Sequence, residues 1–240
     1  MLNIEIIPCL SDNYSYLLCD GDTNTVAIID PSDFNPCDKI INKKYNKLDY
    51  ILNTHHHFDH IGGNQKLKKK YKSKVLGCEV DKDRIPGIDI ALKEKQNFKI
   101  GNAFFEVIFI PGHTKGHIAF YCKDEKIVFT GDTLFSLGCG RIFEGTTKDM
   151  FDSLNKIKSL PKETKVYCGH EYTLNNSKFC ELYDSNNLNL KKKIKNIKRQ
   201  IKYGLPTVPS TIKDELECNI FLRTNDLKSF SKLRDLKDNF

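Results

Sequence analysis

The sequence predicts a mixed α/β body of about 170 residues followed by a small helical unit. In the body, short apolar runs rich in β-branched residues end in turn residues, which is typical of strands. Between these runs, and again after Tyr172, apolar residues recur at helical spacing. No internal repeat and no low-complexity linker divides the chain.

The expected strands begin with an opening meander and continue as more widely separated segments. They cover residues 4–7, 14–19, 25–29, 50–53, 103–110, 118–122, 126–130 and 165–168. Two helices are expected between them, at 63–71 and 148–159. The second has Phe151, Leu154 and Ile157 at helical spacing.

The C-terminal unit begins with a basic amphipathic helix. Leu190, Ile194, Ile197 and Ile201 recur at helical spacing around the Lys-rich stretch 191–202, and Gly204-Leu-Pro stops the helix. Further short helices are expected near 210–217 and 227–236. We expect the apolar stripe to pack on the body and the lysines to face water. No aromatic residues are interleaved on the basic face, as a single-strand binder would need.

Composition excludes several classes of protein. With 39% hydrophobic and 29% charged residues, the 240-residue chain has a globular profile. No apolar run approaches the ~18 residues of a membrane span, and the N-terminus lacks the features of a signal peptide. The net charge of +7 fits an acidic partner, but a codon bias towards Lys, Asn and Ile would also produce it.

The nine cysteines form no Cys-x-x-Cys pair. This pattern argues against a disulfide framework or a thiolate zinc site. We expect buried thiols that behave as small apolar residues in a reducing compartment, and hence a cytoplasmic location.

Histidine placement carries the most information about function. Four of the seven histidines lie within residues 55–60, and the others are in the segments 111–117 and 169–171. Each segment follows an expected strand, and a further strand ends in Gly131-Asp-Thr. Since α/β architectures collect ligand and catalytic groups at the carboxyl ends of strands, these residues are expected to converge.

The spacing can be interpreted as metal coordination. Residues two apart in an extended segment point the same way, so His55 and His57 could hold one cation while His56 points elsewhere. Asp59 and His60, a turn further on, could serve a second cation.

Downstream residues could complete both sites. His113 and His170 would add one ligand to each, and Asp132 could bridge the two ions. Nitrogen and carboxylate ligands without thiolate suit zinc, iron or manganese. Two ions about 3.5–4 Å apart could share a hydroxide whose parent water has a pKa lowered towards ~7.

Other chemistries fit less well. Cys168-Gly-His170 could suggest a cysteine nucleophile, but residues two apart on one strand end rarely meet as an attacking pair. The chain has neither a Gly-x-Ser-x-Gly elbow nor a phosphate loop. His56 and His117 are expected to orient or pack around the site. Asp30 could accept a hydrogen bond from the ring N–H of a ligand histidine that does not face the metal, or it could simply begin a turn.

The motif Thr-His-x-His-x-Asp-His, with the downstream His, Asp and His, resembles the metallo-β-lactamase superfamily. Several further segments are similar to its glyoxalase II, or hydroxyacylglutathione hydrolase, family: residues 10–14, 54–63, 131–135, 138–141, 144–146, 167–173 and 206–211. The resemblance implies a four-layer αβ/βα metallo-β-lactamase sandwich with a small C-terminal helical domain. It places a catalytic domain at 1–171 and a glutathione-recognition domain at 172–240.

The resemblance also implies the cofactors and the reaction. Two divalent ions, zinc or alternatively iron or manganese, would share Asp132; the remaining ligands would be His55, His57 and His113 for one ion and Asp59, His60 and His170 for the other. Asp59 and Asp132 would be the catalytic carboxylates. A hydroxide between the metals would attack the thioester of S-D-lactoylglutathione to give glutathione and D-lactate, the second step of methylglyoxal detoxification.

The same resemblance implies a set of substrate contacts. The residues that match the family's are Arg141, Phe143, His170, Tyr172, Arg234 and Lys237. Arg141 stands where the family usually has Lys, and Phe143 where it usually has Tyr, so one hydroxyl contact is missing. The segment from Arg223 to Arg234 is also shorter than is usual in the family.

Three rival functions fit the sequence less well. A mononuclear iron persulfide dioxygenase would leave Asp59, His60 and His170 without an ion, and a nuclease is favoured only by the positive charge. A non-catalytic or nucleic-acid-binding protein with a structural metal would be expected to lack at least one ligand, and all seven are present. We therefore expect a small-molecule substrate, no nucleic-acid or membrane partner, and a monomer.

Overall fold

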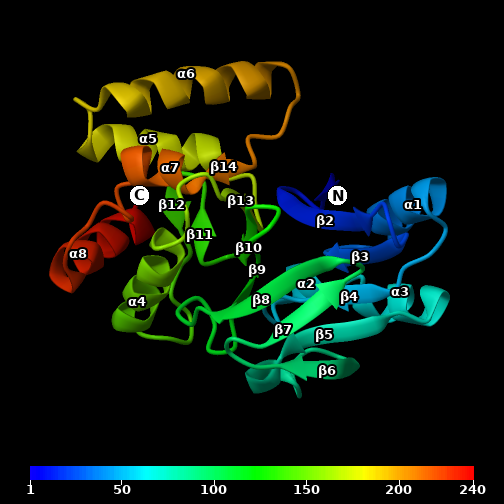
Figure 1. The fold of residues 1–240 in the computed structure, drawn as a ribbon. Coiled ribbons are helices and arrows are strands. Elements are labelled where there is room, and N and C mark those ends of the chain that lie inside the picture. Colours follow the sequence, from blue (N-terminus) through cyan, green and yellow to red (C-terminus); the bar gives the residue numbers. More distant parts are fainter.

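Two six-stranded sheets lie face to face in the computed structural model, which describes residues 1–240, and helices cover both outer faces (Figure 1). The strands of the first sheet run in the order β1-β2-β3-β4-β5-β6. Their bounds are β1 Leu2–Cys9, β2 Asn13–Asp20, β3 Thr25–Ile29, β4 Tyr50–Leu52, β5 Lys74–Cys78 and β6 Ile88–Leu92. β1 to β3 form an antiparallel meander, and β3 to β6 pair in parallel.

The second sheet has the order β14-β13-β10-β9-β8-β7. Its strands are β7 Asn97–Ile100, β8 Ala103–Phe109, β9 Ile118–Cys122, β10 Ile127–Gly131, β13 Lys165–Cys168 and β14 Ser210–Thr211. Only β10 and β13 pair in parallel. A small hairpin of β11 (Leu134–Phe135) and β12 (Gly138–Cys139) follows β10.

The helices divide between the two outer faces. Those of the first half are α1 Phe34–Lys44, α2 Phe58–Ile61, α3 Asn64–Tyr71 and the 3-10 turn Glu79–Asp81. Those of the second half are α4 Thr147–Lys158, α5 Thr173–Tyr183, α6 Leu188–Lys202, α7 Ile212–Cys218 and α8 Leu227–Asp238. None of these helices combines the length and the apolar character needed to span a membrane.

Alternation along the strands explains the layers, because successive side chains of a strand point to opposite faces. In β2, Leu17 packs with α1 and α3, while Leu18 faces the second sheet. In β10, Val128 packs with the C-terminal helices, while Phe129 faces the first sheet. Three apolar layers therefore separate four layers of secondary structure, as predicted for the α/β sandwich.

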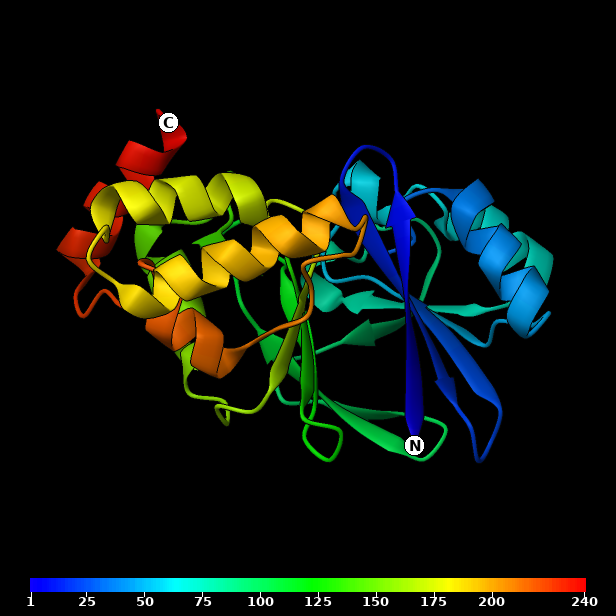
Figure 2. The same cartoon turned by 90° about the horizontal axis from the view of Figure 1, so that it is seen from above.

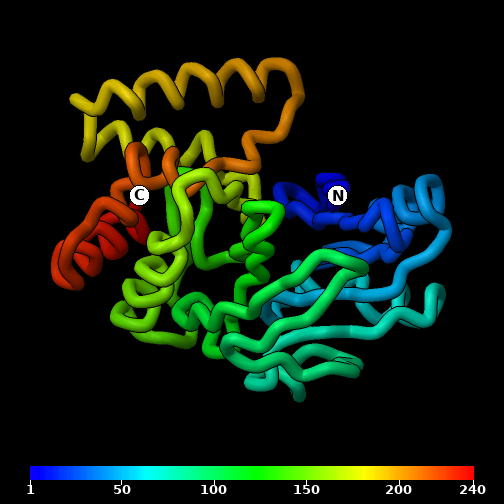
Figure 3. The backbone as a smooth tube through the Cα atoms, in the orientation of Figure 1, coloured from blue at the N-terminus to red at the C-terminus, as the bar shows by residue number.

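The C-terminal helices extend the second half of the fold. Figure 3 shows the blue-to-cyan first part of the chain on one side of the molecule and the yellow-to-red last part on the other. α5 and α6 lie side by side as an antiparallel pair (Figures 1 and 2). Phe179 of α5, Leu190 of α6 and Phe230 of α8 share one apolar core with Leu154 of α4.

The basic helix is α6, and most of its apolar stripe is buried. Leu190, Ile194 and Ile197 are buried as predicted, but Ile201 is exposed. Ile201 lies in the last turn of α6, close to the point where the chain turns away at Gly204. The expected helix near 210–217 begins only at Ile212, because the two preceding residues pair with β13 as β14.

Candidate metal centre and active site

Four strand ends supply the residues of the candidate site. The segment that carries His55 to His60 follows β4 and runs into α2, and His113 follows β8. Asp132 comes directly after β10 and His170 directly after β13, which is parallel to β10. The structure thus brings all seven predicted ligands to one edge of the sandwich, between the two sheets.

His55, His57 and His113 form the first ligand group. One nitrogen from each lies within 4.8 Å of the others, and Nδ1 of His57 is 2.9 Å from Nε2 of His113. Burial lowers the pKa of all three rings, to about 4 for His57. The rings are therefore neutral near pH 7, the form in which imidazole binds metal.

Asp59, His60 and His170 form the second ligand group. The Nε2 atoms of His60 and His170 lie 3.3 Å apart, and Oδ2 of Asp59 is 3.6 Å from the first and 3.4 Å from the second. Burial lowers the pKa of His170, but Asp132 and Asp59 outweigh it and raise the pKa to about 10. The carboxylates give this group a negative electrostatic potential, which favours binding of a cation.

Asp132 lies between the two ligand groups. Its Oδ2 is 3.5 Å from Nε2 of His113 and 3.2 Å from Nε2 of His170, and its Oδ1 is 3.4 Å from Nε2 of His60. The side chain is buried. Gly169 permits this approach, because a Cβ there would collide with Oδ1 of Asp132. The carboxylate therefore contacts ligands of both groups.

The residues present fit two metal ions. Nε2 of His55 is buried without any hydrogen-bond partner, and Oδ1 of Asp132 accepts no hydrogen bond. Buried polar atoms rarely remain unsatisfied in native structures. Lone pairs of nitrogen and carboxylate oxygen, with no thiolate among them, are the donors that zinc, iron and manganese accept.

A third cluster, formed by Asp30, His55 and His60, is better explained as support for the ligands. Asp30 accepts hydrogen bonds from the backbone N–H and the hydroxyl of Thr54, at 2.8 and 2.6 Å. Its Oδ2 also lies 3.1 Å from Nδ1 of His60. Because Nδ1 of His60 faces Asp30, Nε2 is free to face the second ligand group. This is the supporting role considered for Asp30 from the sequence.

Two supporting residues were not singled out by the sequence reasoning. Asp12 places Oδ1 2.8 Å from Nδ1 of His170, and Asn13 donates to Oδ2 of Asp59 at 2.9 Å. Asp12 lies in the turn between β1 and β2, and Asn13 is the first residue of β2; both are more than 150 residues before His170. The only available signal was the polar run Ser-Asp-Asn within the segment 10–14.

His56, His117 and Cys168 lie beside the ligand groups. His117 stacks on His55 and accepts the backbone N–H of Asp132 at Nε2, 3.1 Å away. His56 points to Asp81. Neither belongs to a converging ligand group, as expected. Burial raises the pKa of the Cys168 thiol to about 12, which disfavours a cysteine nucleophile.

A cavity of about 480 Å³ adjoins the ligand groups. Its walls include ligands from both groups together with Asp132, and all the residues predicted to contact substrate: Arg141, Phe143, His170, Tyr172, Arg234 and Lys237. Tyr172 stacks on His170 with ring centroids 4.7 Å apart, and Phe143 meets His113 edge-on at 5.2 Å. The aromatic rings therefore join the ligand groups to the cavity wall.

The cationic residues of the cavity differ in how many of their N–H donors already have a hydrogen-bond partner in the protein. Arg234 is buried and donates to the carbonyl of Cys139 at 2.8 Å and to Asp238 at 2.9 Å. Nζ of Lys237 is buried and has no hydrogen-bond partner, although the rings of Phe179 and Phe240 lie nearby. Burial lowers the pKa of Lys237. Lys237 is therefore available to an anion, whereas most donors of Arg234 are engaged.

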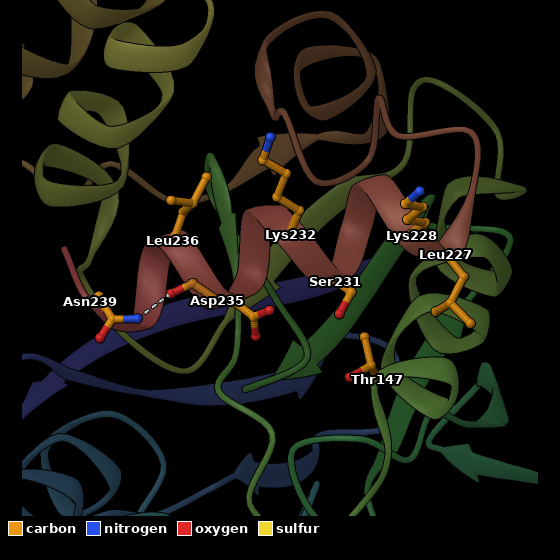
Figure 4. Close-up of a pocket in the computed structure, with 8 residues that line it drawn as sticks. All are labelled: Thr147, Leu227, Lys228, Ser231, Lys232, Asp235, Leu236 and Asn239. Atoms are coloured by element: carbon orange, nitrogen blue, oxygen red, sulfur yellow. Dashed lines mark hydrogen bonds between the residues drawn. The ribbon is translucent and has the colours of Figure 1, made fainter.

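A larger hollow of about 730 Å³ lies elsewhere, along α8 and the start of α4 (Figure 4). Its walls carry Lys228, Lys232 and Asp235 but no histidine and no cysteine. Since none of the ligand groups borders it, this hollow is not the catalytic site.

Comparison with known proteins gives two family matches. The model of the metallo-β-lactamase superfamily matches residues 11–170, and that of the hydroxyacylglutathione hydrolase C-terminus matches residues 171–240. The hydroxyacylglutathione hydrolase of Pelagibacter ubique is 58% identical over 239 residues and is covered completely, as is this chain. That of Methylococcus capsulatus is 44% identical over 93% of this chain and 87% of its own.

Solved structures agree on the fold. The chain superimposes on ETHE1 from Myxococcus xanthus with a TM-score of 0.75 and 23% identity, over 97% of this chain and 90% of that one. At this identity the likeness speaks for the architecture alone.

Proposed function

The chain belongs to the hydroxyacylglutathione hydrolases of the metallo-β-lactamase superfamily, and we propose that the ligand groups and the adjoining cavity form its active site. The reaction is hydrolysis of the thioester S-D-lactoylglutathione to glutathione and D-lactate in methylglyoxal detoxification. The observation that carries this assignment of the site is the shared cavity. Its walls contain residues of both ligand groups, namely His57 and His113 of the first and Asp59 and His170 of the second, and the unpartnered ammonium of Lys237.

The enzyme uses two divalent metal ions. We assign His55, His57 and His113 to one ion and Asp59, His60 and His170 to the other, with Asp132 shared. When bound, two such ions supply a nucleophile at neutral pH and stabilise the negative charge that develops on the thioester oxygen.

The protein's own contribution at this centre is to fix tautomers and orientation. The Nδ1 atoms of His60 and His170 face Asp30 and Asp12, and Nδ1 of His113 donates to the carbonyl of Arg141 at 2.8 Å. In the metal-bound form each of these rings can therefore present the lone pair of Nε2 to the centre. Such outer partners hold ligands in place and raise their basicity.

The cavity is suited to the glutathione part of the substrate. Glutathione carries two carboxylates, and Lys237 offers a desolvated ammonium with no competing partner. Arg141 is exposed at the rim, with its Nε 3.6 Å from Asp238. Phe143 and Tyr172 give apolar and aromatic walls next to the ligand groups. In our proposal Arg234 acts by holding the backbone of β12 that lines the cavity.

We assign residues 1–171 to the metal centre and residues 172–240 to substrate recognition, the division expected from the sequence. The two parts share an apolar core, so they act as one body. All nine cysteines are free and buried, which suits a reducing compartment. We propose a cytoplasmic monomer that uses zinc and does not bind nucleic acid. Gel filtration with light scattering tests the oligomeric state.

The experiment that tests the proposed function compares two substrates. Initial rates are measured on S-D-lactoylglutathione and on a lactoyl thioester that lacks the γ-glutamyl and glycyl parts. We expect a strong preference for the glutathione thioester in kcat/KM, because binding energy from the remote peptide is used at the reacting centre. Equal rates on both substrates would contradict the recognition role of the cavity.

A further inference from the structure

Arg84 joins three segments that are far apart in the sequence. Its guanidinium contacts Asp81 of the 3-10 turn after β5, and its Nη1 lies 2.5 Å from Oε1 of Glu144, in the loop before α4. The same Nη1 is 3.3 Å from Nε2 of His56, the neighbour of the ligand His57. One side chain therefore links the first half of the fold to the second beside the metal centre.

The Asp81 end of this link is rigid. Asp81 is fully buried, and its second oxygen lies 3.2 Å from Nδ1 of His56. The chain passes so close at Gly116 that a Cβ there would collide with the Asp81 carboxylate. Because the planar guanidinium can hold two carboxylates at once in a fixed geometry, Asp81 orients Arg84 towards Glu144.

The Glu144 end of the link belongs to the loop 141–146, which forms part of the cavity wall. Arg141 and Phe143 of this loop line the cavity. The loop is tied to the segment 113–115 by three hydrogen bonds. Nδ1 of His113 donates to the Arg141 carbonyl at 2.8 Å, the Phe143 N–H donates to the His113 carbonyl at 3.2 Å, and the Lys115 N–H donates to Glu144 at 2.8 Å.

We propose that Arg84 is a positioning residue of this hydrolase. Through Glu144 it holds the loop 141–146 in place and so sets the affinity for the glutathione part of the substrate. The identity of that substrate rests on the function proposed above. Neither Arg84 nor Glu144 lines the cavity, so their effect on substrate passes through Arg141 and Phe143.

The test uses Arg84→Gln, Glu144→Gln, the double variant and Arg84→Lys, all as metal-loaded full-length protein. Arg223→Gln is the matched control, because Arg223 is similarly exposed and pairs with Asp184 away from the cavity. Steady-state kinetics on S-D-lactoylglutathione give KM and kcat separately. Metal content and the thermal midpoint establish that each variant is folded and loaded.

We expect Arg84→Gln and Glu144→Gln each to raise KM roughly fivefold, the equivalent of about 1 kcal/mol. Metal content stays near two ions, and kcat changes less than twofold. The double variant should be no worse than either single one, because both remove the same tether. Arg84→Lys should fall between wild type and Arg84→Gln, since lysine cannot hold two carboxylates in fixed geometry.

A second readout does not depend on activity. Hydrogen exchange of the segment 141–146 should be about fivefold faster in both single variants and unchanged in Arg223→Gln. If the wild-type protein fails to hydrolyse the substrate but hydrogen exchange of residues 141–146 is still faster in the variants, the proposed function is wrong, while the role of Arg84 in holding the loop is supported. If KM and exchange match wild type in folded Arg84→Gln and Glu144→Gln, the positioning role of Arg84 is wrong. Additive effects in the double variant would also overturn it.

Discussion

The Nε2 atoms of His60 and His170 lie 3.3 Å apart, and each ring turns its Nδ1 towards a carboxylate. With Nδ1 donating to Asp30 or Asp12, the two Nε2 lone pairs face one another, and two acceptors cannot form a hydrogen bond. Oxygens of Asp59 and Asp132 approach the same point. This convergence of electron pairs is stable only around a cation, which is a proton in the metal-free protein and, in our assignment, a metal ion in the enzyme.

Replacing Asp132 tests the shared ligand. Asp132→Ala should lose metal from both groups and at least about 1,000-fold in kcat, because one carboxylate serves both ions. Metal analysis of the purified protein and steady-state rates give the answer. Asp124→Ala, in the exposed turn before β10, is the matched control and should keep both metals. Full activity with normal metal content in Asp132→Ala would contradict the bridging role.

Replacing Asp12 tests whether the two groups can be separated. Asp12 faces only His170 in the second group, so Asp12→Ala should weaken that site about 10- to 100-fold. The first group, which Asp12 does not touch, should remain filled. Dialysis against a zinc chelator, followed by metal analysis, should therefore reduce the content from two ions to one. Loss of both ions together would show that the groups do not bind independently.

The convergence of the seven predicted ligands could be expected from the sequence, because it depends on short-range spacing and strand ends. His55, His57, Asp59 and His60 lie in one segment, so their relation is nearly fixed by local geometry. The supporting partners could not be predicted in this way. Asp12 reaches His170, and Arg84 reaches Glu144, through pairings that exist only once the two sheets have packed.

The same distinction holds for the fold. Strands that consist of a continuous buried, mostly apolar run, such as β3 and β9, match their expected bounds. β5, β6 and β7 have their apolar residues interrupted by glycine or by polar residues, and the sequence analysis did not identify them. α5 was also not identified, because its buried side chains include Asn176 and Ser177 and its apolar periodicity is weak.

The two cationic residues of α8 should respond differently to replacement. Lys237→Ala should raise KM about tenfold with kcat nearly unchanged, because in our proposal its free ammonium binds a remote part of the substrate. Arg234→Ala should instead lower the free energy of unfolding by about 2–4 kcal/mol, because it leaves the Cys139 carbonyl without its donor. Steady-state kinetics measure the effect on KM, and urea unfolding measures the effect on the free energy of unfolding. An unchanged KM in Lys237→Ala would exclude its assignment as the anion contact.

The metal-free protein should be most stable near pH 6.5. The lowered pKa values keep His55, His57 and His113 unprotonated in the folded state, whereas the same histidines bind protons in the unfolded chain below pH 6.5. Stability therefore falls as the pH drops towards about 4. Above it, Asp132 raises the pKa of both His60 and His170, that of His170 to about 10, so the folded state retains protons that the unfolded chain loses. Stability therefore also falls as the pH rises towards 10.

Thermal unfolding of the metal-free protein from pH 4 to 10 checks this maximum. His170→Gln should reduce the loss of stability on the alkaline side, with His60 accounting for the remainder, and leave the acidic side unchanged. A metal-free protein whose midpoint rises steadily from pH 6.5 to 10 would rule out the proton held at the second group.

The most direct test of the two-ion centre is a reconstitution titration. Zinc is added stepwise to the metal-free protein, and the initial rate of S-D-lactoylglutathione hydrolysis is recorded at each step. The rate should rise until two equivalents are bound and then stay constant, because both ligand groups and the shared Asp132 are needed. A rate that reaches its full value at one equivalent would contradict the two-ion centre.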